Sequence, residues 1–184
     1  MRRLLLFPFL IPSSLAAATC EELWFTRNAA FHQSGYCFTS PLGRAVFGTA
    51  NCPAGEVSLS ERNRRVVDLV SEREELWSCA IDTGATTLDI APVTYRLTLA
   101  DLPVPAEGES ACIGWQGEPV PLSEGYRPEG EISVVIEPGD TVLLNWLPLD
   151  GYDYFEVYDG ERLKGGGWIT QGALRFDLCE MFAG

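Results

Sequence analysis

The sequence predicts an α+β fold in which a disulfide-stapled helical hairpin precedes a small all-β domain. Three observations support this prediction. Apolar residues recur at helical intervals in residues 19–79, and beyond residue 92 they alternate with polar residues. All six cysteines lie after the first 18 residues, and an even number of cysteines in an exported chain indicates a disulfide framework.

Residues 1–18 have the three parts of a secretory signal peptide. A basic start precedes an apolar run over residues 4–15, and small residues follow up to Ala18, after which we expect cleavage. The run is shorter than the roughly 20 apolar residues that cross a bilayer, so no membrane insertion is expected. A lipid anchor on Cys20 is disfavoured because Thr19 fits poorly before a lipidated cysteine. The alternative for the apolar run is a buried first strand or helix. The predicted location is periplasmic or secreted.

The chain is strongly acidic, with 13 basic and 26 acidic side chains. Loss of Arg2 and Arg3 with the signal peptide takes the formal net charge from −13 to −15. Nucleic acids and anionic membrane surfaces attract basic proteins, so neither is an expected partner.

Residues 19–79 are expected to form two helices separated by an irregular loop over residues 36–57. Each helix has a capping box before its apolar periodicity, and Gly35 is a natural residue to end the first helix. The second helix is expected to end near Ser78. The two capping boxes pair Thr19 with Glu22 and Ser58 with Glu61.

Antiparallel packing of these helices would place the cysteine that starts the first beside the cysteine that follows the second. A second pair would then close the loop between them, and a third would join the two ends of the β domain. Six cysteines allow 15 connectivities, and this geometry selects one of them. The predicted bridges are Cys20–Cys79, Cys37–Cys52 and Cys112–Cys179.

Residues 80–92 break the helical pattern and are predicted to be a linker, with the β domain spanning residues 93–184. Its short strands are separated by Gly and Pro turns, a pattern typical of a small barrel or sandwich. Residues 142–146 are expected to be the return strand after 132–136. The expected strands are 93–99, 132–136, 142–146, 154–158, 168–169 and 174–178, with turns at 137–140 and 159–160.

Residues 22–38 resemble the YARHG-type domain of bacterial exported proteins. The resemblance depends on Arg27-Asn28 and on Gly35-Tyr36 followed by Phe38, whereas the Ala-Arg-His-Gly core reads His-Gln-Ser-Gly at residues 32–35. With Cys20, Cys52 and Cys79 added, the chain is similar to the bacterial family called domain of unknown function 4453, over nearly the whole exported part. This resemblance implies an exported domain with no established activity.

The C-terminal part resembles a bacterial SH3-like barrel. The matching pieces follow one another in the order of that fold, which is why the β domain is expected to be a barrel of this type. They are residues 112–115 with 119–122, residues 130–139, residues 153–160, and Gly167-Trp168-Ile169.

One polar cluster on the first helix is the candidate for a catalytic site. His32 is the sole histidine, so any mechanism that uses histidine must use it. One turn earlier Arg27 and Asn28 could complete a polar cluster that holds an anionic group, although all three also fit structural roles. Since CxxC spacing is absent, no zinc site is expected. We assign no catalytic residue, metal or cofactor.

Binding is better supported, because aromatic residues concentrate in the β domain and suit extended peptide or glycan ligands. Tyr126 and Tyr152 lie beside Gly and Pro in expected loops and are predicted to be exposed; with Trp115 they complete the candidate binding residues. Trp146 and Trp168 are expected in the core.

The predicted function is therefore an exported, non-enzymatic module that binds a cell-wall peptide or glycan, or an envelope protein. The first alternative is a cell-wall hydrolase that uses Arg27 and His32, and the second is a structural or inhibitory protein.

Overall fold

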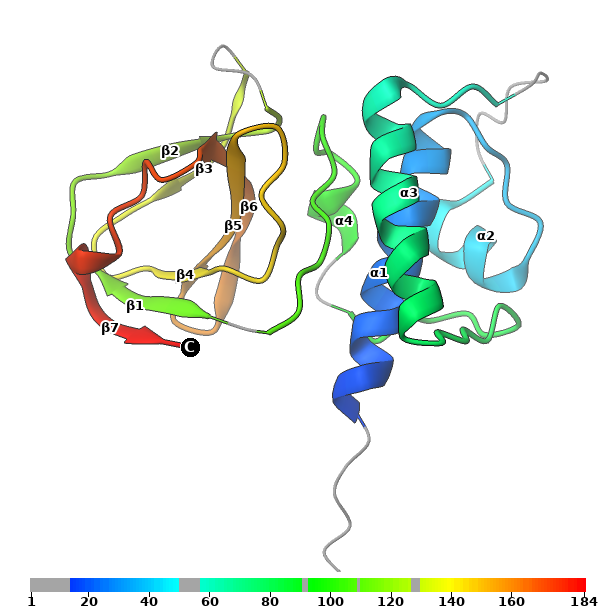
Figure 1. Ribbon diagram of the computed structural model, residues 1–184, viewed down its shortest axis with the longest axis horizontal. Coiled ribbons are helices and arrows are strands. Elements are labelled where there is room, and N and C mark those ends of the chain that lie inside the picture. Colours follow the sequence, from blue (N-terminus) through cyan, green and yellow to red (C-terminus); the bar gives the residue numbers. More distant parts are fainter. Residues whose placement is uncertain (1–13, 50–56, 91–92, 109, 127–129) are drawn as a thin grey trace, which may run out of the picture.

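The computed structural model describes residues 14–49, 57–90, 93–108, 110–126 and 130–184. Helices lie on one side of the molecule and a curved β-sheet on the other, with a short helix between them (Figure 1). This arrangement confirms the predicted α+β class. The helices are α1 (Ser14–Gln33), α2 (Pro41–Phe47), α3 (Glu61–Leu76) and α4 (Val93–Arg96). The strands are β1 (Ala111–Trp115), β2 (Val120–Ser123), β3 (Ile132–Ile136), β4 (Thr141–Leu143), β5 (Tyr152–Asp159), β6 (Arg162–Thr170) and β7 (Cys179–Ala183), with a 3₁₀ turn at Phe176–Leu178.

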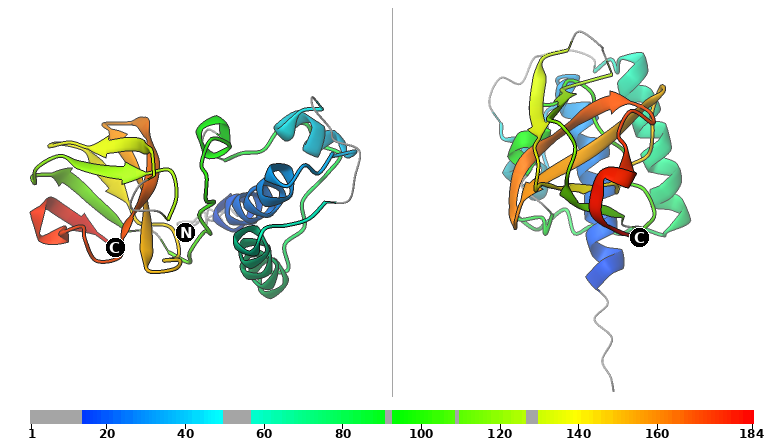
Figure 2. Two further views of the ribbon diagram at one scale, coloured as in Figure 1. Left: turned by 90° about the horizontal axis from the view of Figure 1, so that it is seen from above. Right: turned by 90° about the vertical axis from the view of Figure 1, so that its left-hand side faces the viewer.

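Helices α1 and α3 lie side by side and run antiparallel, as predicted (Figure 2). At one end a disulfide joins Cys20 to Cys79, and at the other the amide of Asn63 donates to the carbonyl of Ala30. The predicted Cys20–Cys79 bridge is thereby confirmed. Because the sulfur of Cys20 forms this bridge, it is not available to carry a lipid.

The ends of these helices follow capping rules, with two corrections. Helix α1 begins at Ser14, so the predicted start at Thr19 is wrong. Helix α3 begins two residues later than expected because Ser60, and not Ser58, is the N-cap. The hydroxyl of Ser60 accepts from the Asn63 backbone N–H at 3.1 Å.

Gly35 ends α1 as predicted. Its φ of 84° is in the left-handed region that glycine enters without strain. The backbone N–H of Gly35 donates to His32, and that of Tyr36 donates to Phe31, which are the bonds of a Schellman motif. The rings of Phe31 and Tyr36 also pack edge to face at 5.9 Å, so the hydrophobic contact typical of this motif is present.

Helix α2 interrupts the loop that was expected to be irregular. Ser40 caps it by accepting from the Gly43 N–H at 3.1 Å, and Pro41 occupies its first turn. A serine followed by proline is a helix-start signal, so the sequence did contain a local indication of α2. Cys37, just before α2, is disulfide-bonded. Its predicted partner, Cys52, lies outside the described residues.

The strands form one antiparallel sheet in the order β3-β2-β6-β5-β4-β1-β7. The sheet is open, with β3 and β7 at its edges, so the antiparallel β architecture is confirmed and a closed SH3-like barrel is not established. The predicted Cys112–Cys179 disulfide is confirmed and links β1 to the edge strand β7.

The predicted pairing of residues 132–136 with 142–146 is wrong. Strands β3 and β4 follow one another across a tight turn, but β3 pairs with β2, and β4 pairs with β1 and β5. The turn itself bonds to the end of β1, because Gly139 donates to the carbonyl of Trp115 and the Trp115 N–H donates to Asp140. The chain therefore turns a corner at residues 137–140 and does not fold back as a hairpin.

Two further strand predictions differ from the structure. Val93–Arg96 is one helical turn, not a strand, because its last two side chains reach opposite neighbours: Tyr95 bonds to β5 and Arg96 bonds to α1. The last strand lies at Cys179–Ala183 and not at 174–178, since Leu174 is instead buried against the sheet. Strand β5 and the turn at Asp159-Gly160 are as predicted.

The molecule has two hydrophobic clusters. The sheet core lies inside the curved sheet and includes Phe155 and Val157. The larger cluster, called here the interface core, joins the helices to the outer face of the sheet. Strand β5 is buried on both faces, because Tyr154 belongs to the interface core. The interface core comprises Leu23, Trp24, Phe25, Ala29, Ala30, Phe38, Leu42, Phe47, Val66, Val70, Leu99, Leu102, Val104, Tyr126, Leu149, Tyr154 and Trp168.

The segment predicted as a linker packs against the interface core through Ile81, Ala85, Leu88 and Ile90. The domain limits at residues 79, 80–92 and 93 remain predictions. In the part of the chain that the structure describes, no helix combines the length and the apolar character needed to cross a membrane.

Candidate functional site

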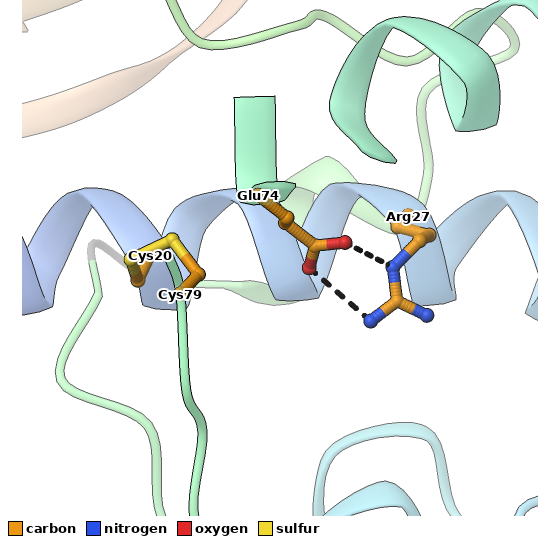
Figure 3. The surroundings of a disulfide bond; sticks show 4 residues. All are labelled: Cys20, Arg27, Glu74 and Cys79. Carbon is orange, nitrogen blue, oxygen red and sulfur yellow. Dashed lines mark hydrogen bonds and ion pairs between the residues drawn. A yellow bond between two sulfur atoms is a disulfide. The ribbon is translucent and has the colours of Figure 1, made fainter. Parts of the chain in front are cut away.

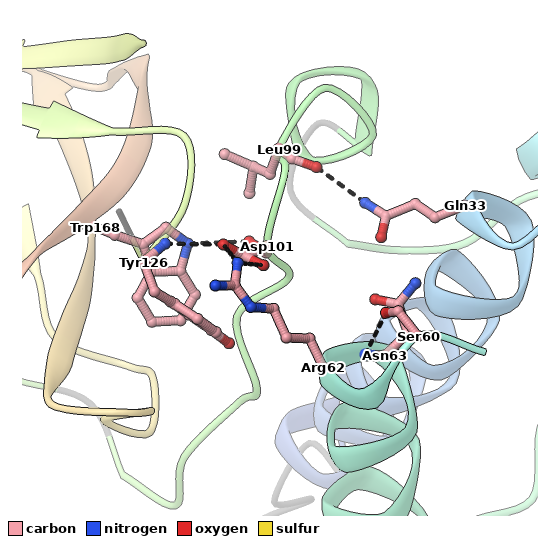
Figure 4. A network of polar contacts seen from close by, with 8 residues as sticks. All are labelled: Gln33, Ser60, Arg62, Asn63, Leu99, Asp101, Tyr126 and Trp168. Carbon is pink, nitrogen blue, oxygen red and sulfur yellow. Dashed lines mark hydrogen bonds and ion pairs between the residues drawn. The ribbon is translucent and has the colours of Figure 1, made fainter. Parts of the chain in front are cut away.

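A polar groove lies where the start of α3 faces the segment that leads into the sheet. Its volume is about 770 Å³. Its walls carry hydroxyl, amide, guanidinium and carboxylate groups, with a smaller apolar part. Figure 4 shows several of these side chains around the space between the two halves of the molecule. The lining residues are Gln33, Ser34, Ser58, Ser60, Glu61, Arg62, Asn63, Leu97, Leu99, Ala100 and Asp101.

The helical wall of the groove is held by hydrogen bonds between α1 and α3. Ser60 caps α3, and the next turn places Asn63 against the end of α1. The Asn63 amide donates to the carbonyl of Ala30 at 3.3 Å and to the hydroxyl of Ser34 at 3.4 Å. Ser34 in turn donates to Ala30. These bonds fix the wall while the side chains of Ser58 and Ser60 stay exposed.

The opposite wall is the segment from Leu97 to Asp101. The side chain of Gln33 crosses from α1 and donates to the Leu99 carbonyl at 2.9 Å (Figure 4). From the sheet side, the carbonyl of Glu124 accepts from the backbone N–H of Ala100 at 3.1 Å. The segment is thus attached to both halves of the molecule.

Arg62 and Asp101 form the polar link between the two walls. The Nη1 atom of Arg62 lies 2.8 Å from each carboxylate oxygen of Asp101, which is 5% exposed. Asp101 also accepts from the backbone N–H of Tyr126 at 2.8 Å, and its carbonyl accepts from the indole of Trp168 at 2.9 Å. The hydrogen bond to Asp101 raises the pKa of the Arg62 guanidinium, which stays charged. The guanidinium also lies over the ring of Tyr126, 5.4 Å from its centroid.

The three candidate residues on α1 do not form a common site. Arg27 makes a two-point ion pair with Glu74 of α3, with Nε 2.6 Å and Nη2 3.2 Å from the carboxylate oxygens (Figure 3). Asn28 is 8% exposed and donates to the Trp24 carbonyl one turn earlier at 2.7 Å. His32 packs its ring 5.2 Å from that of Phe47. The contacts of Arg27 and His32 fasten α1 to α3 and α2, and the Asn28 bond lies within α1.

The three aromatic candidates lie in two places. Trp115 is buried in the sheet core, and its indole donates to the Glu118 carbonyl at 3.0 Å. Tyr126 and Tyr152 do lie together, with ring centroids 6.2 Å apart. The expectation that Tyr126 is exposed is wrong, because its ring packs edge to face on Trp168 at 4.3 Å and is 7% exposed. Burial raises the pKa of Tyr126 above its ordinary range.

A second polar cluster is enclosed between α1, α4 and β5. Arg96 pairs with Glu22 and also donates to the hydroxyl of Thr26, while Tyr95 donates to Glu156 of β5. Burial acts to lower the pKa of Arg96, but its neighbours, Glu22 foremost, hold it above its ordinary value.

The carboxyl at the sheet side of this cluster titrates abnormally. Burial raises the pKa of Glu156, and it raises the pKa of Tyr158, a second hydrogen-bond donor to Glu156, to about 12. Because Arg96 is 1% and Glu156 5% exposed, this cluster joins the two halves and does not face solvent.

Sequence reasoning missed Arg62, Asp101 and Asn63, the polar residues of the groove. The capping box expected at Ser58 and Glu61 indicated the start of this helix but not the groove beside it. Three arginines lie in the five residues that follow, an unusual density for an acidic chain, and this was the available signal. In the described part of the chain, no group of three or more His, Cys, Asp and Glu side chains is placed to hold a metal ion.

Comparisons with known families match two parts of the chain. A family model described as YARHG domain matches residues 4–75, which supports the resemblance noted for residues 22–38. A family model described as Domain of unknown function (DUF4453) matches residues 78–184, a shorter range than the expected cover of nearly the whole exported chain. No curated protein and no solved structure matches the chain.

Proposed function

The chain belongs to the family described as domain of unknown function (DUF4453), and we propose that it is an exported binding module of the bacterial cell envelope. Its ligand, in this proposal, is a cell-wall fragment held in the groove between α3 and residues 97–101. The observation that carries the proposal is the groove itself, which is large enough for a small oligomer at about 770 Å³ and is lined by hydroxyl and amide groups.

The placement of the groove also supports binding. Both walls are fixed by hydrogen bonds to the rest of the protein, so little ordering is needed when a ligand enters. Peptidoglycan is rich in hydroxyl and amide groups, which pair with serine, asparagine and glutamine side chains.

A binding role fits the contacts of α1 better than hydrolysis does. The donors Nε and Nη2 of Arg27 are engaged by Glu74, and His32 lies against Phe47. Within the described residues no hydrogen bond joins His32 to a serine or a carboxylate, which a hydrolytic triad would require. For this reason the proposal keeps the predicted non-enzymatic class.

The disulfides and the YARHG match are consistent with an extracytoplasmic protein. We propose that residues 1–18 direct its export to the periplasm or the medium. Sequencing the N-terminus of exported protein tests this, since cleavage after Ala18 would leave Thr19 first.

The β region is, in our proposal, a divergent bacterial SH3-like barrel. The strong curvature of the sheet and the buried sheet core support this reading (Figure 1). The open edge at β7 is the departure from a closed barrel.

A groove-filling substitution tests the proposed function. Ser58→Trp adds a large side chain at an exposed lining position, and Ser71→Trp is the matched control at an exposed position of α3 outside the groove. We expect purified peptidoglycan to retain the wild type and Ser71→Trp but not Ser58→Trp. Equal retention of all three proteins, or retention of none, contradicts the proposal.

A further inference from the structure

The proposed groove contains one cation whose hydrogen-bonding capacity is partly used. The Nη1 atom of Arg62 is engaged by Asp101, while Nε and Nη2 have no partner among the residues that the structure describes. A guanidinium carries five N–H groups, so donors remain on these two nitrogens. The Arg62 side chain is 40% exposed, which leaves room for a ligand to reach them.

The orientation of Arg62 is set from the other half of the molecule. Asp101 is buried and is held by Tyr126 and Trp168, both of which belong to the interface core. The carboxylate therefore acts as a fixed support for the guanidinium, and Figure 4 shows the two groups in contact. An arginine held in this way loses little side-chain freedom when a ligand binds.

The charge of the groove disfavours an anionic ligand. The charges of Arg62 and Asp101 offset one another, and Glu61 adds a carboxylate to the lining. The formal net charge of the chain, −13, acts in the same direction at longer range. A neutral oxygen acceptor, such as an amide carbonyl, can use the free donors of Arg62 without this repulsion.

The remaining surface of the groove suits a methyl group beside such a carbonyl. Leu97 and Ala100 supply apolar groups on the wall that faces Arg62, and Asn63 and Glu61 supply acceptors for an amide N–H on the α3 wall beside Arg62. A secondary amide next to a methyl group occurs in N-acetylated sugars and in alanyl peptides, which are both parts of peptidoglycan.

We propose that Arg62 is the ligand-contacting donor of the groove, that Asp101 positions it, and that the recognised group is a neutral secondary amide beside a methyl. This inference rests on the proposed function and adds the ligand group and the residues that select it.

Two matched pairs of probes test the inference by calorimetry. Triacetylchitotriose and cellotriose are both uncharged and differ at the acetamido position, and acetyl-trialanine amide and acetyl-trialanine acid differ at the terminal carboxylate. We expect triacetylchitotriose or acetyl-trialanine amide to bind about tenfold more tightly than its partner, a factor that corresponds to about one charge-assisted hydrogen bond. Cellotriose lacks the secondary amide, and the peptide acid keeps that amide but adds the disfavoured carboxylate. Preference within the sugar pair or the peptide pair identifies the source of the amide.

Two variants distinguish direct contact of Arg62 with the ligand from the positioning of Arg62 by Asp101. Arg62→Lys keeps the charge beside Asp101 and removes the spare planar donors, so it should lose about tenfold in affinity for the preferred amide probe. Asp101→Asn leaves Arg62 without its counter-charge, so the preference between the two trialanine probes should shift toward the acid. If Asp101 had a purely structural role, its substitution would weaken the binding of both trialanine probes equally. Thermal unfolding of each variant verifies folding.

Three results would overturn the inference. They are wild-type affinity in Arg62→Lys, an unchanged preference in Asp101→Asn, and the absence of discrimination within both probe pairs. If peptidoglycan retention still depends on Ser58 in these cases, the groove remains the binding site and this assignment of ligand group and residues is wrong.

Discussion

Arg96 of the short helix α4 forms an ion pair with Glu22 of α1 at the boundary between the helices and the sheet. The guanidinium lies over the rings of Phe25 and Trp146, at 4.5 Å and 4.9 Å from their centroids. The buried side chain of Arg96 thus contacts Glu22 and Phe25 of α1 on one side and Trp146 of the β half on the other. The two halves are thus joined by specific buried contacts.

Removal of Arg96 should therefore weaken the whole fold. Arg96→Met keeps much of the apolar stem but leaves the carboxylate of Glu22 without its partner, and breaking a buried pair in this way costs about 3–5 kcal/mol. Urea unfolding measures the loss. The double variant Arg96→Met with Glu22→Gln should recover part of it, because no unpaired charge remains.

An exposed ion pair provides the control for this prediction. Arg162 and Asp159 are both well exposed, and Arg162→Met should leave unfolding unchanged within error. Equal destabilisation by Arg96→Met and Arg162→Met would refute the structural role of the buried pair.

Glu156 should make stability depend on pH. Burial raises its pKa above the ordinary value of 4.5, so the folded protein holds this proton more tightly than the unfolded chain does. The resulting stabilisation is present below pH 4.5 and is lost as the pH rises through the raised pKa. The charged and titratable groups that face this carboxyl are Glu22, Arg96, Tyr95, Tyr154 and Tyr158.

Glu156→Gln tests this by removing the titration while it keeps an amide of the same shape. We expect a melting temperature that falls less between about pH 5 and about pH 8 than in the wild type. Parallel pH profiles of the two proteins would show that another group causes the dependence.

Local signals predicted much of the helical half. Gly35 and the capping pattern near Ser60 act on adjacent residues. The helix ends that they set can therefore be predicted from sequence to within about two residues. The three disulfide pairs followed from antiparallel helices and from the ends of the β domain, and two of them are confirmed.

What failed depended on contacts between distant residues. Alternation at Val93, Tyr95 and Leu97 is a strand pattern, but the pairing of Tyr95 with Glu156 favours a helical turn, and those residues are 61 apart in sequence. The groove has the same origin, because Arg62 and Asp101 come together across 39 residues. Pairings between residues this far apart in the sequence cannot be recognised from one sequence until the fold is known.

Gly167 should tolerate no side chain, because β6 passes close to β2 at this point. A Cβ atom there would lie 2.7 Å from the Cβ of Leu122 and 2.9 Å from the carbonyl of Ser123. Overpacking of this kind costs about 1–3 kcal/mol, so Gly167→Ala should unfold at a lower urea concentration. Gly84→Ala is the control, since its nearest contact is the flexible carboxylate of Asp82. The reverse order of stabilities would argue against this strand pairing.

The Cys112–Cys179 disulfide should stabilise the edge of the sheet as well as the fold. It closes a sequence separation of 67 residues, and the loop-entropy model assigns about 4 kcal/mol to a bridge of that length. The Cys20–Cys79 bridge closes 59 residues, so its removal should cost a similar amount.

Hydrogen exchange distinguishes the local effects of the two disulfides, whereas their similar unfolding free energies do not. Strand β7 pairs with β1 on one side, and no strand of the described residues pairs with its other side, so we expect it to depend on the disulfide for its anchorage. Replacement of Cys112 and Cys179 by alanine should release the amides of β7 while those of α1 and α3 stay protected. The same replacement at Cys20 and Cys79 should instead raise exchange at the facing ends of α1 and α3. If β7 kept its protection without its disulfide, the ladder to β1 would be sufficient to hold the edge strand.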